Sequence, residues 1–170
     1  MNHYKTPFVI AEIGCNHKGD LAIAKEMINM AKFFCKADAV KFQKRNNIEL
    51  LSAEQYQQPH PNPENAYGNT YGAHREFLEF SILQHQELKV YCDQIGMVYS
   101  SSVWDLTSAK EIASLHPLFI KIPSACNNNF DLLHWLCENY KGEIHISTGM
   151  TTKEEIENLV NFFIQKKRNQ

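Results

Sequence analysis

The sequence lacks the features that would place a chain in or across a membrane. No apolar run is long enough to span a bilayer, and residues 1–5 lack the apolar core of a secretory signal. We therefore expect a soluble, cytoplasmic protein with no membrane partner.

A strong bias of charge is also absent. The 17 basic and 19 acidic residues are spread along the chain and give a formal net charge of -2. Nothing in this balance favours binding to nucleic acid or another polyanion, so no nucleic-acid partner is expected. The one basic cluster, Lys166 to Arg168, indicates the solvated end of a helix.

Paired cysteine motifs are missing as well. There are five cysteines, an odd number without a CxxC pair, at positions 15, 35, 92, 126 and 137. This pattern excludes a disulfide framework and a zinc site of the common kinds. We expect reduced and mostly buried thiols.

What the chain does contain is a strand followed by a polar turn and an amphipathic helix, five times in succession. The expected strands are 8–13, 39–43, 97–102, 118–122 and 143–147. Helices are predicted to begin after Asp20, at capping boxes opened by Ser81, Ser108 and Thr152, and at Phe130. Strict alternation of this kind predicts parallel strands with right-handed crossovers, and so a single α/β domain.

One connection is far longer than the others. Residues 44–75 are rich in turn formers, including Pro59, Pro61 and Pro63. A connection of this length favours an active-site insertion, although a surface loop without a role is the alternative.

The two faces of each predicted strand differ in polarity. One face is apolar, and the other carries Glu12, Lys41, Gln43, Lys121, His145 and Ser147. A sheet with helices on both sides would be apolar on both faces, whereas the inner face of a barrel opens into a site at the carboxyl ends of its strands. The pattern therefore favours a barrel over an open sheet.

Two lysines on that polar face need a partner, because burying an unpaired ammonium costs several kcal/mol. A structural ion pair, for example between Glu12 and Lys41, would satisfy one of them. Two lysines on one face, with serines at neighbouring strand ends, are better explained by an anionic ligand. Helix N-termini after the strands would add backbone donors, so we predict a site for a phosphorylated, acidic molecule.

Five segments in order and spacing resemble the sialic acid synthase family, including the legionaminate and pseudaminate synthases. They are residues 11–20, 37–43, 71–79, 121–124 and 147–152, with the sequences AEIGCNHKGD, ADAVKFQ, YGAHREFLE, KIPS and STGMTT. No one segment is decisive, but five in register cover nearly the whole chain.

The resemblance implies a TIM barrel that condenses phosphoenolpyruvate with the aldehyde of an N-acetylated amino sugar, giving a nonulosonic acid and phosphate. It assigns the binding of phosphoenolpyruvate to Lys41, Ser102, Lys121, Ser124 and Ser147. Glu12 would act as an acid or base or orient the substrates, and Gln43 would contact the sugar. A divalent metal, Mn or Mg, is expected for the family.

The sequence departs from the family at one position near the sugar. After residues 121–124 many members have Gly-Glu, where this chain has Ala125 and Cys126. The departure puts N-acetylmannosamine in doubt as the substrate. Cys126 is not expected to be a nucleophile, because this chemistry needs no enzyme-bound intermediate.

The second departure is length. A complete barrel has eight βα units in about 250 residues, so residues 1–170 predict an incomplete TIM barrel of about five units. The family's two metal-binding histidines and its antifreeze-like domain come later, so we assign no metal ligand here. His17 and His145 are expected to be structural. Open edges predict marginal stability or self-association, and weak or absent activity.

Two other functions remain open. A lysine at the end of a barrel strand is also typical of Schiff-base, class I aldolases, which would use Lys41 or Lys121. A non-catalytic barrel fragment that only binds a ligand is the third possibility.

Overall fold

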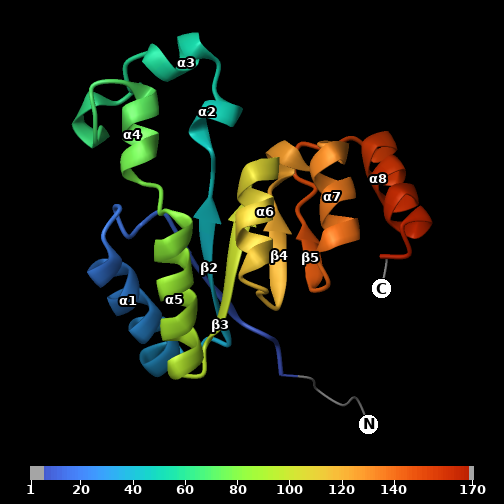
Figure 1. Cartoon of the computed structure of the whole chain (residues 1–170), viewed down its shortest axis with the longest axis horizontal. Coiled ribbons are helices and arrows are strands. Elements are labelled where there is room, and N and C mark those ends of the chain that lie inside the picture. Colours follow the sequence, from blue (N-terminus) through green and yellow to red (C-terminus); the bar gives the residue numbers. More distant parts are fainter. Residues whose placement is uncertain (1–5, 169–170) are drawn as a thin grey trace.

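The computed structural model describes residues 6–168, which form a five-stranded sheet and the helices that follow its strands (Figure 1). The strands are β1 (Ile10–Gly14), β2 (Ala39–Lys44), β3 (Val98–Val103), β4 (Phe119–Ile122) and β5 (Glu143–Ile146). The α-helices are α1 (Leu21–Asn29), α2 (Asn47–Leu50), α3 (Ala53–Gln57), α4 (Tyr71–Phe77), α5 (Ile82–Gln94), α6 (Leu106–Ser114), α7 (Phe130–Asn139) and α8 (Lys153–Gln165). A π-helical turn, η1 (Met30–Phe34), and two 3₁₀ turns, η2 (Pro63–Asn65) and η3 (Ser124–Cys126), complete the elements.

The sheet follows the order of the chain. Its order is β1-β2-β3-β4-β5, and all four neighbouring pairs are parallel. Because every connection carries a helix back to the start of the next strand, the carboxyl ends of all five strands lie at one edge. The fold is an open segment of a (β/α) barrel, as the sequence predicts.

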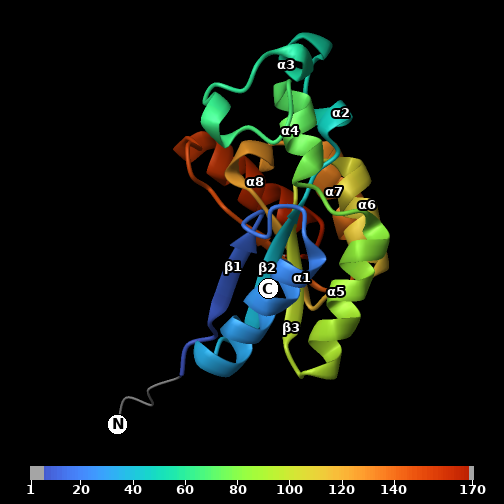
Figure 2. The same cartoon turned by 90° about the vertical axis from the view of Figure 1, so that its left-hand side faces the viewer.

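The helices cover one face of the sheet only. One buried cluster packs Val40 and Phe42 of β2 against Ile28 of α1 and Leu88 of α5. A second cluster lies at the other end of the sheet and packs strand residues against α6, α7 and α8; its members include Ile112, Ile120, Ile122, Leu133, Leu136 and Phe163. Figure 2 shows α1 overlapping β2 and α5 beside β3. These apolar residues alternate with the polar ones along the strands, which leaves the polar face free of helices.

The local signals for helix starts are correct at four of five positions. Asp20 caps α1, Phe130 begins α7, and Ser81 and Thr152 open capping boxes at α5 and α8. The predicted capping box at Ser108 is wrong.

The cap of α6 is Asp105 instead. Its Oδ1 accepts from the backbone N–H of Ser108, and its Oδ2 accepts from the hydroxyl of Ser108 at 2.8 Å. The helix therefore begins three residues earlier, since the carboxylate of Asp105 accepts a hydrogen bond from a free N–H group of the first turn.

The connection after β2 is more ordered than its composition predicts. Residues 45–78 contain α2, α3, η2 and α4, whereas the sequence predicts a turn-rich loop. Each short helix has its own side-chain cap, for example Ser52 at α3 and Thr70 at α4. Gly72 of α4 allows close packing, because a Cβ there would lie 2.3 Å from the ring of Tyr56. The segment projects beyond the carboxyl ends of the strands (Figure 1).

Two further expectations concern exposure. None of the helices in residues 6–168 is both long and apolar enough to cross a membrane.

The five cysteines are free thiols, but only Cys92 and Cys126 are buried and Cys35 is exposed, so the expectation of mostly buried thiols is wrong. Cys35 is exposed because it follows η1 at the surface end of the first helix.

Candidate functional site

The polar side chains predicted for one face of the sheet do share that face. In the strand register Glu12 lies beside Lys41, and one row further along Gln43, Ser102, Lys121 and His145 are neighbours on successive strands. Residues paired in a parallel register project from the same side of the sheet. Sequence positions far apart thus form one polar surface near the carboxyl ends of β1 to β5.

Lys41 is at the centre of this surface. Its side chain is only 12% exposed, and its ammonium forms an ion pair with the carboxylate of Glu12. The same ammonium donates to the hydroxyl of Ser102 at 3.4 Å, across the boundary between β2 and β3. The structural ion pair that the sequence allows for Lys41 is therefore present, and a serine of the proposed ligand site lies beside it.

The ammonium groups of Lys41 and Lys121 are close enough to influence one another. Burial, and after it the charge of Lys121, lowers the pKa of Lys41 to about 8. Burial also lowers the pKa of Lys121. The carboxylate of Glu12 acts in the opposite direction, but that side chain is 49% exposed, so solvent screens its effect. Two partly desolvated cations on one face favour the binding of an anion.

Ser124 and Ser147 lie at the same edge, directly after β4 and β5. A Cβ on Gly149 would lie 3.5 Å from the Ser124 hydroxyl oxygen, so the two strand-end loops are neighbours. Asn127 holds them in place by donating to the backbone carbonyl of Ser147 at 3.0 Å and to the hydroxyl of Thr151 at 2.6 Å. Among the described residues neither serine hydroxyl forms a hydrogen bond with Lys41 or Lys121, so the structure brings the two serines to the same edge but not into contact with the lysines.

The end of β1 approaches the site through a glycine. Gly14 has a φ of +58°, and a Cβ at this position would lie 3.3 Å from Nε2 of Gln43 and 3.4 Å from Oε1 of Glu12. Glycine is therefore the residue that suits both the backbone conformation and the close approach. The packing places Gln43 and Glu12 side by side.

The histidines expected to be structural have structural contacts. His17 is 1% exposed, stacks on Phe80 at 4.0 Å between ring centroids and accepts a hydrogen bond from the N–H of Gly19. His145 shares the polar face but stacks on Phe119 at 4.5 Å and contacts Glu143 at 3.0 Å.

The described residues do not provide a metal site. Within residues 6–168 no group of three or more histidine, cysteine, aspartate or glutamate side chains could hold a metal ion. These residues do not fit the divalent ion expected for the resemblance, and we derive no step through it.

Cys126 lies near Lys121 but is unsuited to nucleophilic attack. It is buried, and burial, followed by the charge of Asp105, raises the pKa of its thiol. The thiol is therefore kept neutral despite the nearby Lys121, which acts in the opposite direction.

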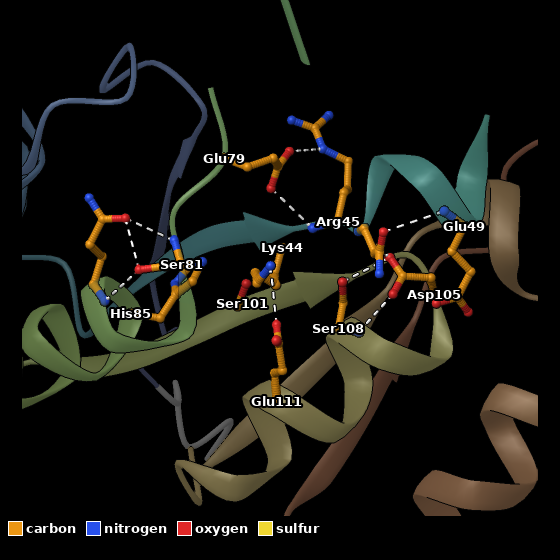
Figure 3. Close-up of polar contacts among 12 residues, drawn as sticks. Lys44, Arg45, Glu49, Glu79, Ser81, His85, Ser101, Asp105, Ser108 and Glu111 are labelled. Carbon is orange, nitrogen blue, oxygen red and sulfur yellow. Dashed lines mark hydrogen bonds and ion pairs between the residues drawn. The ribbon is translucent and has the colours of Figure 1, made fainter. Parts of the chain in front are cut away.

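A second polar network at the end of β2 was not predicted. The buried side chains of Arg45 and Glu79 pair through Nε and Oε1 at 2.5 Å, and the N–H of Arg45 donates to Oε2 of Glu79 at 3.1 Å (Figure 3). Arg45 also donates to the sulfur of Cys15 at 2.8 Å, which ties the end of β1 to the end of β2. Since residues 45 and 79 begin and end the long connection, the pair fixes both of its ends.

Other contacts of this network join the connection to α6. The N–H of Asn46 donates to Oδ2 of Asp105, the capping residue, at 2.7 Å, and the N–H of Leu106 donates to Glu49 at 3.2 Å. Lys44 pairs with Glu111 of α6 at 3.1 Å (Figure 3). The only sequence signal for these contacts is a run of charged residues directly after a buried strand, which does not identify their distant partners.

A cavity of about 730 Å³ lies away from the candidate site. It is at the amino ends of β4 and β5, and Leu118 and Gly142 are among its lining residues. His145 of the polar face also lines it, but none of the residues predicted to bind phosphoenolpyruvate or the sugar does, so we assign the site to the opposite edge of the sheet.

Comparison with known proteins gives consistent matches. The profile of the NeuB family matches residues 27–170. The N-acetylneuraminate-9-phosphate synthase of Homo sapiens is 37% identical over 147 residues, which cover 86% of this chain and 40% of the relative. The N,N'-diacetyllegionaminic acid synthase of Legionella pneumophila is 33% identical over 151 residues, covering 89% of this chain and 42% of the relative.

A solved structure shows the same arrangement. The N-acetylneuraminic acid (sialic acid) synthetase of Leptospira borgpetersenii, in complex with citrate, superposes with a TM-score of 0.79 at 25% sequence identity. The match covers 99% of this chain and 55% of that one. The chain thus spans about 40% of the length of the curated relatives named above.

Proposed function

The chain belongs to the NeuB family, and on that premise we propose that it binds phosphoenolpyruvate for condensation with an N-acetylated amino-sugar aldehyde. The observation that carries the proposal is the position of Lys41, Lys121 and Ser102 on one polar face at the carboxyl ends of parallel strands. That edge is where enzymes of this fold bind their ligands.

The lysine pair suits the charge of phosphoenolpyruvate, which carries both a phosphate and a carboxylate. Lys41 and Lys121 would supply the two cations, and hydroxyls of Ser102, Ser124 and Ser147 would donate to the remaining oxygens. Hydrogen bonds between charged partners contribute about 1.5–3 kcal/mol each. Partial burial of Lys41 strengthens such contacts, because fewer water molecules compete for its ammonium.

The reaction forms one carbon–carbon bond and releases one phosphate. The C3 carbon of phosphoenolpyruvate attacks the aldehyde carbon, and the aldehyde oxygen takes a proton and becomes a hydroxyl. Water adds at C2, and the C2–O bond to phosphate breaks to leave the ketone of the nonulosonic acid. Glu12, half exposed beside Lys41, would exchange a proton with the aldehyde oxygen. Gln43, next to Glu12 across Gly14, would contact the sugar.

The names of the relatives define two classes of sugar. The human relative is named for a phosphorylated product, whereas the Legionella relative is named for a product without phosphate. Ala125 and Cys126, which stand where many members have Gly-Glu, leave room for an amino sugar other than N-acetylmannosamine. We therefore propose an N-acetylated amino sugar as the second substrate class.

Binding and turnover are tested separately. Titration calorimetry of the chain with phosphoenolpyruvate should show saturable binding that Lys41→Met and Lys121→Met each weaken, while Lys153→Gln, on the exposed surface of α8, has no effect. Phosphate release with N-acetylated amino sugars and Mn²⁺ then measures turnover, which we expect to be weak or absent for this chain alone. Phosphoenolpyruvate binding that is unaffected by both lysine substitutions would contradict the proposal.

One observation favours a Schiff-base aldolase as the second candidate. The lowered pKa of Lys41, about 8, increases the fraction of neutral amine that an imine requires. The neighbouring Lys121 and Ser102 suit a phosphate better than an imine, which needs one desolvated amine. Borohydride trapping with pyruvate separates the two, because only the aldolase would form a covalent adduct on Lys41 or Lys121. A binding fragment without catalysis would bind phosphoenolpyruvate but form neither adduct nor product.

A further inference from the structure

One buried side chain joins the loop after β5 to the loop after β4. We propose that Asn127 is a positioning residue, which holds residues 147–151 in place before a ligand binds and so fixes Ser147 for a phosphate. The inference rests on the proposed function, because it takes Ser147 as one of the groups that bind phosphoenolpyruvate.

Asn127 donates to two positions of the second loop. It follows η3, and its side chain belongs to a residue that is only 2% exposed. The amide nitrogen donates to the backbone carbonyl of Ser147 at 3.0 Å and to the hydroxyl of Thr151 at 2.6 Å. The hydroxyl of Thr151 donates in turn to the carbonyl of Gly149 at 3.1 Å. Three residues of the second loop are therefore bonded, directly or through one hydroxyl, to a single amide.

The chemistry of these partners makes the amide hard to replace. A carbonyl oxygen only accepts, and the hydroxyl of Thr151 already uses its one hydrogen on Gly149. Both partners thus need a donor, and the amide nitrogen of Asn127 supplies one hydrogen to each. An apolar or acidic side chain of similar size could make neither contact.

The backbone of the second loop needs such a constraint. Met150 has a φ of +59°, a conformation that residues other than glycine rarely adopt. Its side chain is 92% exposed, so packing does not hold the residue in this conformation. An unfavourable backbone conformation persists only where its surroundings determine it. The hydrogen bonds at Gly149 and Thr151, on either side of Met150, do so.

The loop after β4 is itself fastened to α8. Asn128 donates to Oε1 of Glu155 at 2.9 Å, and Oε2 of the same carboxylate accepts from the N–H of Thr152 at 2.7 Å in the capping box of α8. Two adjacent asparagines therefore bond the first loop to the second loop and to the first turn of the helix that follows it.

Ser147 is also bonded to the strand that carries Lys121. Its backbone N–H donates to the carbonyl of Ile122, the residue after Lys121, at 3.1 Å. Since Asn127 bonds its carbonyl, both backbone groups of Ser147 have partners on neighbouring segments. The direction of its Cα–Cβ bond is thereby set, and only the hydroxyl needs to rotate towards a phosphate oxygen. A donor positioned in advance binds more tightly, because less conformational freedom is lost on binding.

A double-mutant cycle tests whether Asn127 acts through Ser147. Titration calorimetry with phosphoenolpyruvate compares the natural chain with Asn127→Ala, Ser147→Ala and the double variant. We expect each single substitution to weaken binding about tenfold, and Asn127→Ala to change the affinity less than about twofold once Ser147 is alanine. A role in stability alone would not produce this coupling. The matched control is Asn139→Ala on the exposed surface of α7, whose amide donates to the carbonyl of Trp135 at 2.9 Å; it should leave the affinity unchanged.

Hydrogen exchange without ligand tests the same inference independently of phosphoenolpyruvate. The N–H of Ser147 should exchange at least about tenfold faster in Asn127→Ala than in the natural chain, while the N–H of His85, bonded to Ser81 in the first turn of α5, exchanges at an unchanged rate. Circular dichroism checks the fold of the variant. If Asn127→Ala is unfolded, Thr151→Val, which keeps the size of its side chain, must show the faster exchange and the coupling to Ser147→Ala.

Each remaining outcome decides the question. Unchanged exchange at Ser147, or losses of affinity that simply add in the double variant, would overturn the positioning role of Asn127. A natural chain that does not bind phosphoenolpyruvate, but in which Asn127→Ala speeds the exchange at Ser147, would refute the proposed function and keep the role of Asn127 in holding the loop.

Discussion

The ammonium nitrogen of Lys41 lies 3.4 Å from the hydroxyl oxygen of Ser102, which stands on the neighbouring strand β3. The contact is long for a hydrogen bond between these groups, so both retain donors for a third partner. Lys121 reaches the same region from β4, where it is the register partner of Ser102. Three donors from three successive strands thus surround one position at the carboxyl edge of the sheet.

The first prediction separates the charge of Lys41 from the hydroxyl of Ser102. Lys41→Met should weaken phosphoenolpyruvate binding about tenfold to a hundredfold, since hydrogen bonds to charged groups contribute about 1.5–3 kcal/mol. Ser102→Ala should weaken it less, by about 1 kcal/mol. Calorimetry on both single variants and the double variant measures their coupling, and strictly additive losses would show that the two groups do not share one ligand.

The second prediction concerns the pH dependence of that binding. Lys41 must be protonated to hold an anion, and its pKa in the free protein is about 8. Well below pH 8, the titration of Lys41 should therefore not change the affinity for phosphoenolpyruvate. Above pH 8 the free protein has lost the proton, so the affinity should fall by up to about tenfold per pH unit.

The fall continues until the pH passes the pKa of Lys41 in the complex, which the bound anion raises. Titrations at several pH values between 6.5 and 9.5, in buffers of different ionisation enthalpy, also count the proton taken up on binding. An affinity for phosphoenolpyruvate that rises between pH 8 and 9 would contradict a role for charged Lys41. Lys41→Met provides the control, since its remaining affinity should lack this dependence.

The sequence predicts the fold well because its signals are local. Alternating polarity identifies the face that carries Lys41 and Lys121, since side chains in any strand alternate and only one face can pack on helices. Short capping motifs identify helix starts for the same reason, as at Ser81 and Thr152. The error at Ser108 also has a local cause, because Asp105 and Ser108 can both cap a helix and stand three positions apart. The hydrogen bond from the N–H of Ser108 to Oδ1 of Asp105 decides between them.

The rest of the site depends on contacts between residues that lie far apart in the sequence, and local patterns do not predict such contacts. Glu79 is 34 positions from Arg45, and Cys15 is 30 positions from it, so no periodicity relates them. The short helices of residues 45–78 are equally hard to predict, because one-turn helices gain little from propensity and depend on tertiary packing. The resemblance to a family marks residues 71–79 as a shared segment, but it does not indicate that Arg75 donates to the hydroxyl of Tyr71.

The third prediction is that the Arg45–Glu79 pair stabilises the fold. Both side chains are 7% exposed, so Glu79→Gln would leave a buried guanidinium without its counter-charge. Removing one member of a buried pair typically costs about 3–5 kcal/mol of unfolding free energy. Urea denaturation followed by circular dichroism measures this loss.

A matched control and a compensating variant complete the test. Glu157→Gln breaks the exposed pair with Lys153, whose atoms lie 3.6 Å apart, and should change the unfolding free energy by no more than about 0.5 kcal/mol. The double variant Arg45→Met, Glu79→Leu removes both charges and should recover much of the loss. If Glu79→Gln were no more destabilising than Glu157→Gln, the ends of the long connection would not be fixed by this pair.

The fourth prediction follows from the burial of His17 in neutral form. Its ring stacks on Phe80 and accepts from the N–H of Gly19 at 3.1 Å, and burial lowers its pKa to about 4. In the unfolded chain the ring has an ordinary pKa near 6.5. Between these two pH values the ring of His17 is protonated in the unfolded state but neutral in the folded state. His17 therefore destabilises the fold progressively as the pH falls from about 6.5 to about 4.

The expected loss from this one residue is on the order of 3 kcal/mol across that interval. His17→Asn keeps an acceptor for the N–H of Gly19 but has no titrating group, so its unfolding free energy should depend less on pH than that of the natural chain. His85 remains in both proteins, and its pKa is lowered to about 3 mainly by burial, so most of its contribution cancels in the comparison. Urea denaturation at pH 7 and pH 4.5 measures the difference between the two slopes. Parallel pH profiles for the two proteins would mean that His17 is protonated within the fold, and its stacked, desolvated position would then need a counter-charge that residues 6–168 do not show.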